Sequence, residues 1–142
     1  MTGSFSMERK LDQILRVLDD LASESAKGTP IIVEGRRDVD ALNELKIRGR
    51  IIQAKSGGKN VLDLLSMIEA YGKDEVILLL DFDRRGRELT RYLTQRLEKM
   101  KIKPNTVFWR ELSSFLRRDV KDIEGLSTYI KTLMRKIGKT SE

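Results

Sequence analysis

Two carboxylates, Asp81 and Asp83, come directly after an apolar run that begins at Val76. A continuous apolar run of this length is typical of a buried strand in a parallel sheet, so the two aspartates would stand at its carboxyl end. In an extended chain, side chains two positions apart point the same way. Two carboxylates on the same side repel each other, and a hard divalent cation such as Mg²⁺ would let both groups stay ionised. The alternative is that Asp81 ends the strand and Asp83 caps the following helix.

A further carboxylate, Glu34, lies between the short β-branched segment 31–33 and Gly35. Open α/β sheets bind ligands at the carboxyl ends of their strands, which makes Glu34 a candidate site residue; the alternative is an ordinary exposed turn residue. If its strand neighbours the one that ends at Asp81, the carboxylates converge. Aspartates that hold a cation and a glutamate that moves protons would make a phosphoryl-transfer site. Asp38 is predicted to cap the helix that follows.

The elements that position these residues alternate between strand and helix. The apolar spacing predicts helices over 7–26, 39–45, 61–68, 87–100 and 111–116, and a last one from 123. Strands are predicted at 31–33, 51–52, 76–80 and 106–109, while the opening MTGSFS is expected to be disordered. This order predicts an α/β fold with a four-stranded parallel sheet and helices on both faces. The strand that ends at Asp81 is expected to be central, beside the strand that ends at Glu34.

A glycine-rich turn with two lysines, KSGGKN, leads from the second strand into the next helix. Glycines ahead of a helix leave backbone N–H groups free to bind phosphate, so Lys55, Gly57, Gly58 and Lys59 are candidates. The spacing is not that of a Walker A loop, and a tight turn with incidental lysines is the alternative. Asn60 is predicted to cap the helix in a capping box.

The composition limits the chemistry that is available. The 142 residues include no cysteine and no histidine, which excludes disulfides, thiolate zinc sites and Cys or His nucleophiles. A net charge of +6, from 28 basic and 22 acidic residues, favours a polyanion such as nucleic acid as the partner. No apolar run reaches membrane-spanning length, so no membrane partner is expected and a cytoplasmic location follows by default.

Arginines cluster in the segments that flank the predicted acidic edge. Their guanidinium groups suit phosphate oxygens, although solvated helix charges in pairs such as Arg84 with Glu88 are the alternative. The candidates for nucleic-acid contact are Arg36, Arg37, Arg84, Arg85, Arg87 and Arg91.

Two segments, IIVEGRRD and VILLLDFDRRG, resemble the motifs of Toprim domains, which occur in topoisomerases and bacterial-type primases. The resemblance implies that Glu34 is a general acid/base. It implies that Asp81 and Asp83 bind Mg²⁺ or Mn²⁺, with Glu34 completing the acidic set. The motif residues without a chemical role are Gly35, Asp38, Gly57, Gly58 and Gly86.

The resemblance assigns 28–110 to the Toprim domain. Residues 1–27 are then a tail with an amphipathic helix, and 111–142 are a C-terminal helical extension. A stand-alone chain of this size is similar to the small ribosomal-RNA maturases. This similarity implies a Mg²⁺-dependent, nuclease-like protein that acts on nucleic-acid phosphodiesters in RNA processing, with RNA ahead of DNA and the ribosome or an RNA-processing complex as partner.

Two other functions stay open. The first is a non-catalytic module that binds RNA or the ribosome through the same surface. The second is a small-molecule phosphohydrolase of the haloacid-dehalogenase type, which also uses Asp-x-Asp after a strand. In that class the pair usually ends the first strand and precedes Gly-Thr, whereas here it precedes Arg-Arg-Gly.

Overall fold

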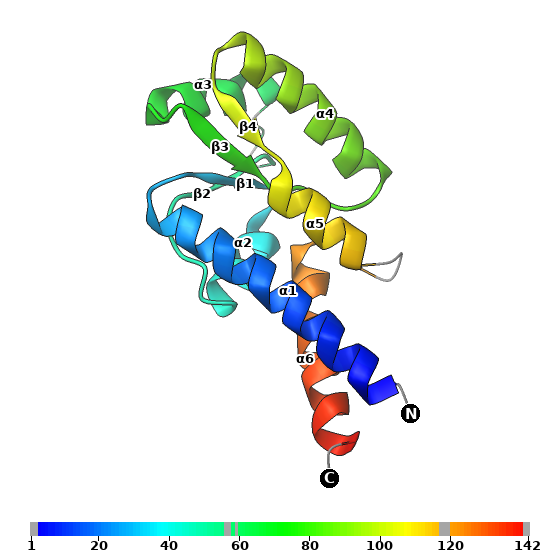
Figure 1. Ribbon diagram of the computed structural model, residues 1–142. Helices are drawn as coiled ribbons and strands as arrows, with labels where there is room; N and C mark the ends of the chain where they lie inside the picture. Colours follow the sequence, from blue (N-terminus) through cyan, green and yellow to red (C-terminus); the bar gives the residue numbers. More distant parts are fainter. Residues whose placement is uncertain (1–2, 56–57, 59, 117–119, 141–142) are drawn as a thin grey trace.

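The computed structural model describes residues 3–55, 58, 60–116 and 120–140. Its strands form one parallel sheet in the order β2-β1-β3-β4 (Figure 1). The strands are β1 Ile31–Val33, β2 Ile51–Gln53, β3 Glu75–Leu78 and β4 Lys103–Asn105. In register, Ile31 lies beside Ile51 on one side and Ile77 on the other. The predicted parallel sheet is confirmed, and β3 lies inside it, next to β1.

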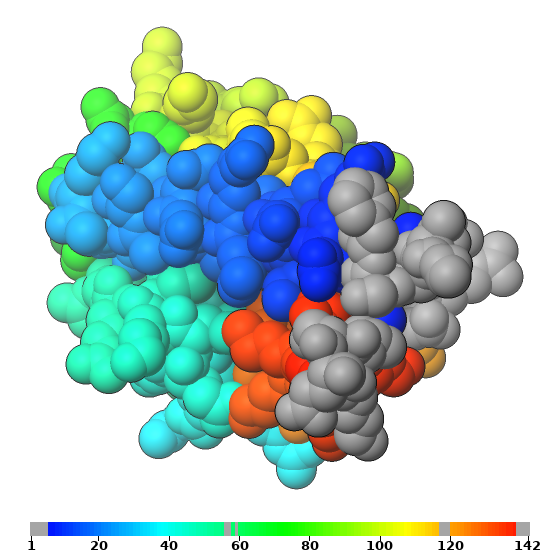
Figure 2. Space-filling view, turned by 60° about the horizontal axis from the view of Figure 1, so that its bottom comes forward, coloured from blue at the N-terminus to red at the C-terminus, as the bar shows by residue number. Residues whose placement is uncertain are grey.

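Helices cover both faces of the sheet, as predicted (Figure 1). They are α1 Gly3–Ala26, α2 Arg36–Glu44, α3 Val61–Tyr71, α4 Arg84–Lys99, α5 Val107–Phe115 and α6 Ile123–Thr140. Helices α3 and α4 pack on one face, and α1, α2, α5 and α6 contribute to the core on the other. Figure 2 shows α1 along the surface on this side of the molecule, with the segment that follows α2 and part of α6 next to it. Among the described residues, no helix is long and apolar enough to cross a lipid bilayer.

Alternation along the strands supplies the two cores. Ile31 and Ile77 face the core that contains α1 and α6, and Ile32 and Leu78 face the core that contains α3 and α4. All four side chains are fully buried, and each contributes about 1.5–3 kcal/mol relative to exposure. The subdivision into 1–27, 28–110 and 111–142 stays a prediction.

The fourth strand was predicted in the wrong place. The strand is Lys103–Asn105, and the apolar segment assigned to it begins α5 at Val107. Pro104 is tolerated because β4 is an edge strand, where a missing backbone N–H costs no ladder bond on the solvent side. The Asn105 side chain accepts a hydrogen bond from the Val107 N–H at 3.0 Å, which turns the chain out of the sheet.

Three helix starts also differ from the prediction. Helix α1 already begins at Gly3, within the segment expected to be disordered. Helix α4 begins at Arg84 rather than at 87. The N-cap of α2 is Gly35, and Asp38 instead occupies the third helical position, where it accepts the Gly35 N–H at 3.2 Å. The predicted capping box at Asn60 is confirmed.

Candidate acidic site at the carboxyl edge of the sheet

The backbone ladder of the sheet fixes the start of the loop that carries Glu34. Beyond the strand ends, Ala54 N–H donates to the Val33 carbonyl at 2.8 Å and Lys55 N–H to the Glu34 carbonyl at 2.9 Å. On the other side of β1, Leu79 N–H donates to the Ile32 carbonyl at 2.9 Å. Parallel neighbours end at the same edge, so the loop after β1 and the loop after β3 leave the sheet side by side. Glu34 itself is only 7% exposed.

Asp81 lies among other carboxylates. Burial, and after it the negative charges of Glu34, Asp38, Asp122 and Asp83 in decreasing order, together raise the pKa of Asp81 to about 7. Burial also raises the pKa of Asp38, an effect opposed by hydrogen bonds from the backbone of Gly35 and Glu124. The folded chain therefore holds a local excess of negative charge around Asp81.

Asp83 has a structural role that can be seen directly. It is the N-cap of α4, and its Oδ1 accepts the Gly86 N–H at 2.8 Å. This is the capping alternative raised by the sequence. The bond occupies one carboxylate oxygen, and no described residue donates to Oδ2. The cap therefore leaves an oxygen that could serve a ligand.

Gly86 lets α4 pack directly on the backbone of Asp81. A Cβ at Gly86 would lie 1.9 Å from the Asp81 carbonyl oxygen, far inside van der Waals contact. The Gly86 carbonyl is in turn bonded by the buried Thr90 hydroxyl at 2.7 Å. The glycine of this motif is thus required by a close approach of backbone to backbone.

Glu34 has a cationic partner that the sequence did not indicate. Lys55 Nζ lies 3.1 Å from Glu34 Oε1, and the Lys55 side chain is 59% exposed. Lys55 was predicted to contact phosphate. In the structure it compensates the charge of Glu34 at the neighbouring strand end.

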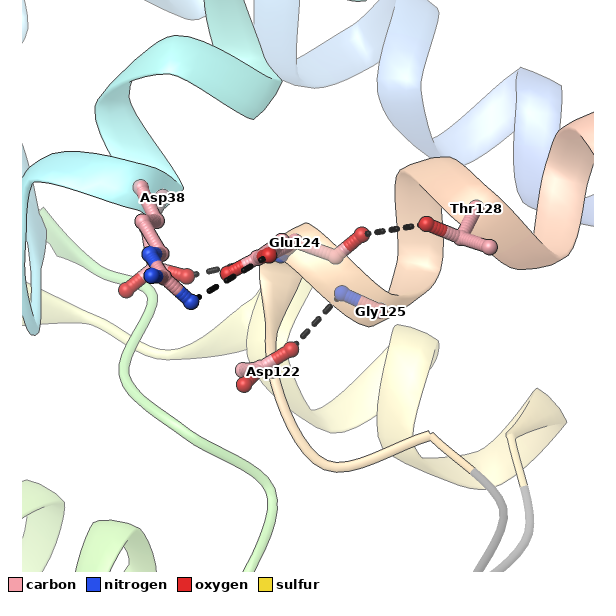
Figure 3. Close-up of polar contacts among 6 residues, drawn as sticks. Asp38, Asp122, Glu124, Gly125 and Thr128 are labelled. Atoms are coloured by element: carbon pink, nitrogen blue, oxygen red, sulfur yellow. Dashed lines mark hydrogen bonds and ion pairs between the residues drawn. The ribbon is translucent and has the colours of Figure 1, made fainter.

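The segment before α6 brings one further acidic group, Asp122, to this edge, where the starts of α2 and α6 meet (Figure 3). Asp38 Oδ1 accepts the Glu124 N–H at 3.4 Å, so Asp38 joins the starts of α2 and α6. Asp122 Oδ1 accepts the Gly125 N–H at 2.7 Å, so Asp122 stabilises the start of α6. Its charge also reaches Asp81 and Asp38, which links the C-terminal segment electrostatically to the acidic site.

Two aromatic rings border the same loop. Trp109 Nε1 donates to the Asp81 carbonyl at 3.2 Å, and Phe82 N–H donates to the Lys121 carbonyl at 2.6 Å. The rings of Phe82 and Trp109 are stacked, with centroids 6.5 Å apart. Sequence reasoning missed Trp109 because it assigned this residue to a strand. The signal that could have corrected the assignment was Asn105, whose side chain accepts the N–H of Val107, the first residue of α5.

Comparison with known proteins agrees with this geometry. Residues 29–110 match the family model of the Toprim domain. The chain belongs to the Toprim domain family. Over 142 residues it is 32% identical to a UPF0292 protein of Methanosarcina barkeri, covering 100% of this chain and 97% of the relative. A UPF0292 protein of Methanocaldococcus jannaschii is 38% identical over 120 residues, which cover 84% and 91% of the two chains.

A solved structure has a similar fold. It is described as a putative protein from Aquifex aeolicus, and it superposes on this Toprim protein with a TM-score of 0.64 and 27% sequence identity. The match covers 77% of this chain and 94% of the other.

Toprim domains generally bind Mg²⁺, and the donor chemistry of this Toprim protein fits such an ion. The groups around Asp81 are carboxylates, the oxygen ligands that hard cations prefer, and their mutual repulsion would be relieved by a positive charge. In the described part of the chain, however, no three acidic side chains already lie close enough together to hold a metal ion. The acidic set is suitable in kind and is not assembled in advance.

The arginines of this Toprim protein divide into paired and site-facing groups. Arg36 pairs with Asp40 at 3.1 Å and Arg84 pairs with Glu88 at 3.1 Å, as the helix-charge alternative expected. Arg37 lies 3.9 Å from Glu124.

Two other arginines face clefts beside the acidic edge, and Arg91 is exposed on α4. Arg85 lines a cleft of about 370 Å³ together with Glu34 and Lys55. Arg87 lines a second cleft and donates to the Phe82 carbonyl at 3.3 Å. Gly58 adopts a positive φ of 77°, whereas Gly57 and Lys59 lie outside the described residues.

Proposed function

We propose that this Toprim protein is a Mg²⁺- or Mn²⁺-dependent enzyme that acts on the phosphodiester bonds of RNA, in a nuclease-like reaction. The observation that carries the proposal is the position of Asp81, which is partly buried among the carboxylates Glu34, Asp38, Asp122 and Asp83; burial first, and these charges after it, raise its pKa to about 7. A chain that needed these residues only for folding would gain nothing from such repulsion. Clustered carboxylates with perturbed pKa values at a strand edge are typical of functional sites.

In the proposed reaction, different residues of the site would have different roles. Asp81, the second oxygen of Asp83 and Glu34 would hold the ion, which would stabilise negative charge on the phosphate. Glu34 would also move the proton of the attacking or leaving oxygen. Arg85 and Arg87 would hold the phosphates of the strand on either side. We place the protein in the cytoplasm, with the ribosome or an RNA-processing complex as its partner.

A non-catalytic RNA-binding module is the second candidate, and specific contacts favour it. Glu34 is held by Lys55 at 3.1 Å, and Asp83 serves as a helix cap. Both contacts give these carboxylates a structural role, which a protein that binds RNA through the Toprim surface without catalysis would also need.

Titration with Mg²⁺ separates the two candidates. Labelled structured RNA, single-stranded RNA and duplex DNA are incubated with the full chain, and cleavage is followed on gels. Glu34→Gln keeps the size of the side chain and cannot ionise, so turnover should fall by about a hundredfold or more while RNA binding is unchanged or tighter. If no substrate is turned over at any Mg²⁺ or Mn²⁺ concentration, but RNA binds, the binding module is the function.

Substitution of the two cleft arginines tests whether the ligand of this face is a nucleic acid. The double change Arg85→Ala and Arg87→Ala should weaken binding to all RNA sequences alike and flatten its salt dependence by roughly one to two units of slope. Arg96→Ala is the matched control, because Arg96 lies near the far end of α4, over the Tyr92 ring. Equal binding by the double variant and wild type across salt concentrations would remove nucleic acid from this face and favour a small phosphorylated substrate.

A further inference from the structure

The cleft that adjoins Asp83 is built differently from the acidic site itself. It has a volume of about 950 Å³, within the range of roughly 300–1,000 Å³ that is usual for small-molecule sites. The loop after β3, helix α5 and the segment before α6 enclose it. The side chains that matter here are Phe82, Arg87, Trp109, Arg110, Ser113 and Lys121.

The aromatic residues give this cleft an apolar surface. Phe82 and Trp109 are both half-buried, and their rings are inclined by only 24°. The one polar atom of the Trp109 ring is already bonded to the Asp81 carbonyl. Trp109 can therefore offer the cleft only ring carbon, the surface on which a flat aromatic ligand stacks.

The charged residues give the cleft a positive rim. Arg87, Arg110 and Lys121 line it, against the single carboxylate of Asp83. In the described part of the chain, neither Arg110 nor Lys121 forms an ion pair. A ligand that combines a flat ring with negative charge complements this arrangement.

The cleft is continuous with the acidic site. Asp83 belongs to both, and the Trp109 ring is bonded to the backbone of Asp81. A polymer whose backbone phosphate lies at the carboxylates would therefore reach the cleft with the adjacent base. Ser113 lines the same cleft, and its buried hydroxyl has no hydrogen-bond partner among the described residues, so a polar group is left over there.

We propose that this cleft binds one unpaired base of the RNA strand whose phosphate lies at the acidic site. The inference rests on the proposed function in one respect, namely that RNA is the substrate. A base in a duplex is stacked and paired and cannot enter, whereas an unpaired base can stack on an aromatic side chain. The protein should consequently act next to unpaired nucleotides.

Trp109 itself provides the measurement, because it is the only tryptophan of the chain. The full-length protein is titrated with a short single-stranded RNA in EDTA, and its tryptophan emission is recorded. Two controls are used: the single strand with abasic sites in place of its bases, which keeps the charge of the single strand, and a fully paired RNA duplex of half its length, which carries about the same total charge. We expect quenching by the single strand and roughly tenfold weaker binding of both controls.

Three outcomes would overturn the inference. The first is equal affinity for the single strand, the duplex and the abasic strand. The second is binding of the single strand without a change in Trp109 emission. The third is quenching by single-stranded DNA or by an acidic peptide but not by RNA.

Variants locate the effect in the cleft. These variants have no tryptophan, so their binding is followed by the fluorescence anisotropy of labelled RNA: Trp109→Leu should lose the preference for bases over abasic strand, while Trp109→Phe keeps a stacking ring and should retain most of it. Tyr92→Leu is the matched control, because Tyr92 is an aromatic residue on α4 that is 42% exposed. A folded Trp109→Leu protein with undiminished preference contradicts the proposal.

A second variant covers the case in which Trp109→Leu does not fold. Arg110→Ala should weaken single-strand binding several-fold, whereas Lys103→Ala on β4 should not. Equal effects of these two changes count against the cleft. Because the titrations need no turnover, a protein that binds bases and never cleaves RNA would refute the enzyme and leave the base site standing. A protein that cleaves duplex and single-stranded RNA equally would do the reverse.

Discussion

The chain turns from strand to helix in a similar way at the ends of β1 and β3, but the two turns handle their charge differently. Each places a carboxylate after an apolar strand and arginines at the following helix start, with a glycine just before the helix after β1 and inside the first turn of α4 after β3. After β1, Glu34 is compensated by Lys55 at 3.1 Å. After β3, Asp81 has only burial and neighbouring carboxylates acting on it, and its pKa rises to about 7.

The glycines that follow the two strands also differ, in the space that surrounds them. Gly35 is an extended N-cap with open space where a Cβ would stand. Gly86 lies against the Asp81 carbonyl with no such space. The comparison teaches that the chain satisfies the first turn with its own cation and leaves the second, tightly packed turn in need of an external positive charge.

The largest expected effect tests the packing difference. Gly86→Ala should lower the free energy of unfolding by about 3 kcal/mol or more, because the added carbon overlaps the Asp81 backbone and α4 must shift. Gly35→Ala should cost less than about 1 kcal/mol, the difference between these residues as N-caps. Urea denaturation of both variants measures the contrast. Similar losses in the two would show that the turns are packed alike.

A smaller effect tests the charge difference. In the absence of divalent cations, Asp81→Asn should stabilise the protein at pH 8 by about 1–2 kcal/mol. The shift of the Asp81 pKa from 3.8 to about 7 would be worth about 4 kcal/mol if unscreened, and partial exposure reduces it.

The pH dependence has a definite sign. The raised pKa means that the folded protein holds the Asp81 proton more tightly than the unfolded chain, so stability falls as pH rises from about 4 to 7. The Asn variant lacks this fall, and its advantage should vanish below about pH 4. Denaturation series in EDTA at several pH values check the prediction. An advantage that is the same at every pH would assign it to packing.

The smallest effect concerns the cation that the chain supplies. Lys55→Met should lower the free energy of unfolding by less than about 1 kcal/mol, since Lys55 is 59% exposed. It should also raise the affinity for Mg²⁺ a few-fold, because a competing positive charge next to Glu34 is gone. Lys27→Met removes a lysine that is also exposed and lies at the same 3.1 Å from its partner Glu24, but precedes β1, whereas the acidic site follows it, and should leave Mg²⁺ affinity unchanged. Calorimetric titration of both variants decides whether Lys55 competes with the ion.

Much of the fold could be predicted from the sequence because the inner strands are stabilised by the burial of their own apolar side chains. Ile31 and Ile77 are fully buried, and such segments stand out as apolar runs. β4 has no such signal. Its residues Lys103 and Asn105 are held by backbone pairing with β3 at the edge, including Lys103 N–H to the Asp74 carbonyl at 2.7 Å.

The residues of the candidate site also fall into a predictable and an unpredictable group. Glu34, Asp81 and Asp83 follow strands and were accessible to motif reasoning, although their chemical roles stay predictions. Lys55 and Trp109 approach the site from other elements, and their contacts depend on how those elements pack. A sequence read segment by segment cannot supply such contacts.

The missing histidines have a practical consequence for Asp81. The chain has no histidine or cysteine, and burial together with the neighbouring carboxylates raises the pKa of Asp81 to about 7. An ion that binds this carboxyl near neutral pH should therefore release protons, and fewer of them as the pH rises above the raised pKa. Binding heats measured in buffers of different ionisation enthalpy would count these protons, and the count would report on this carboxyl.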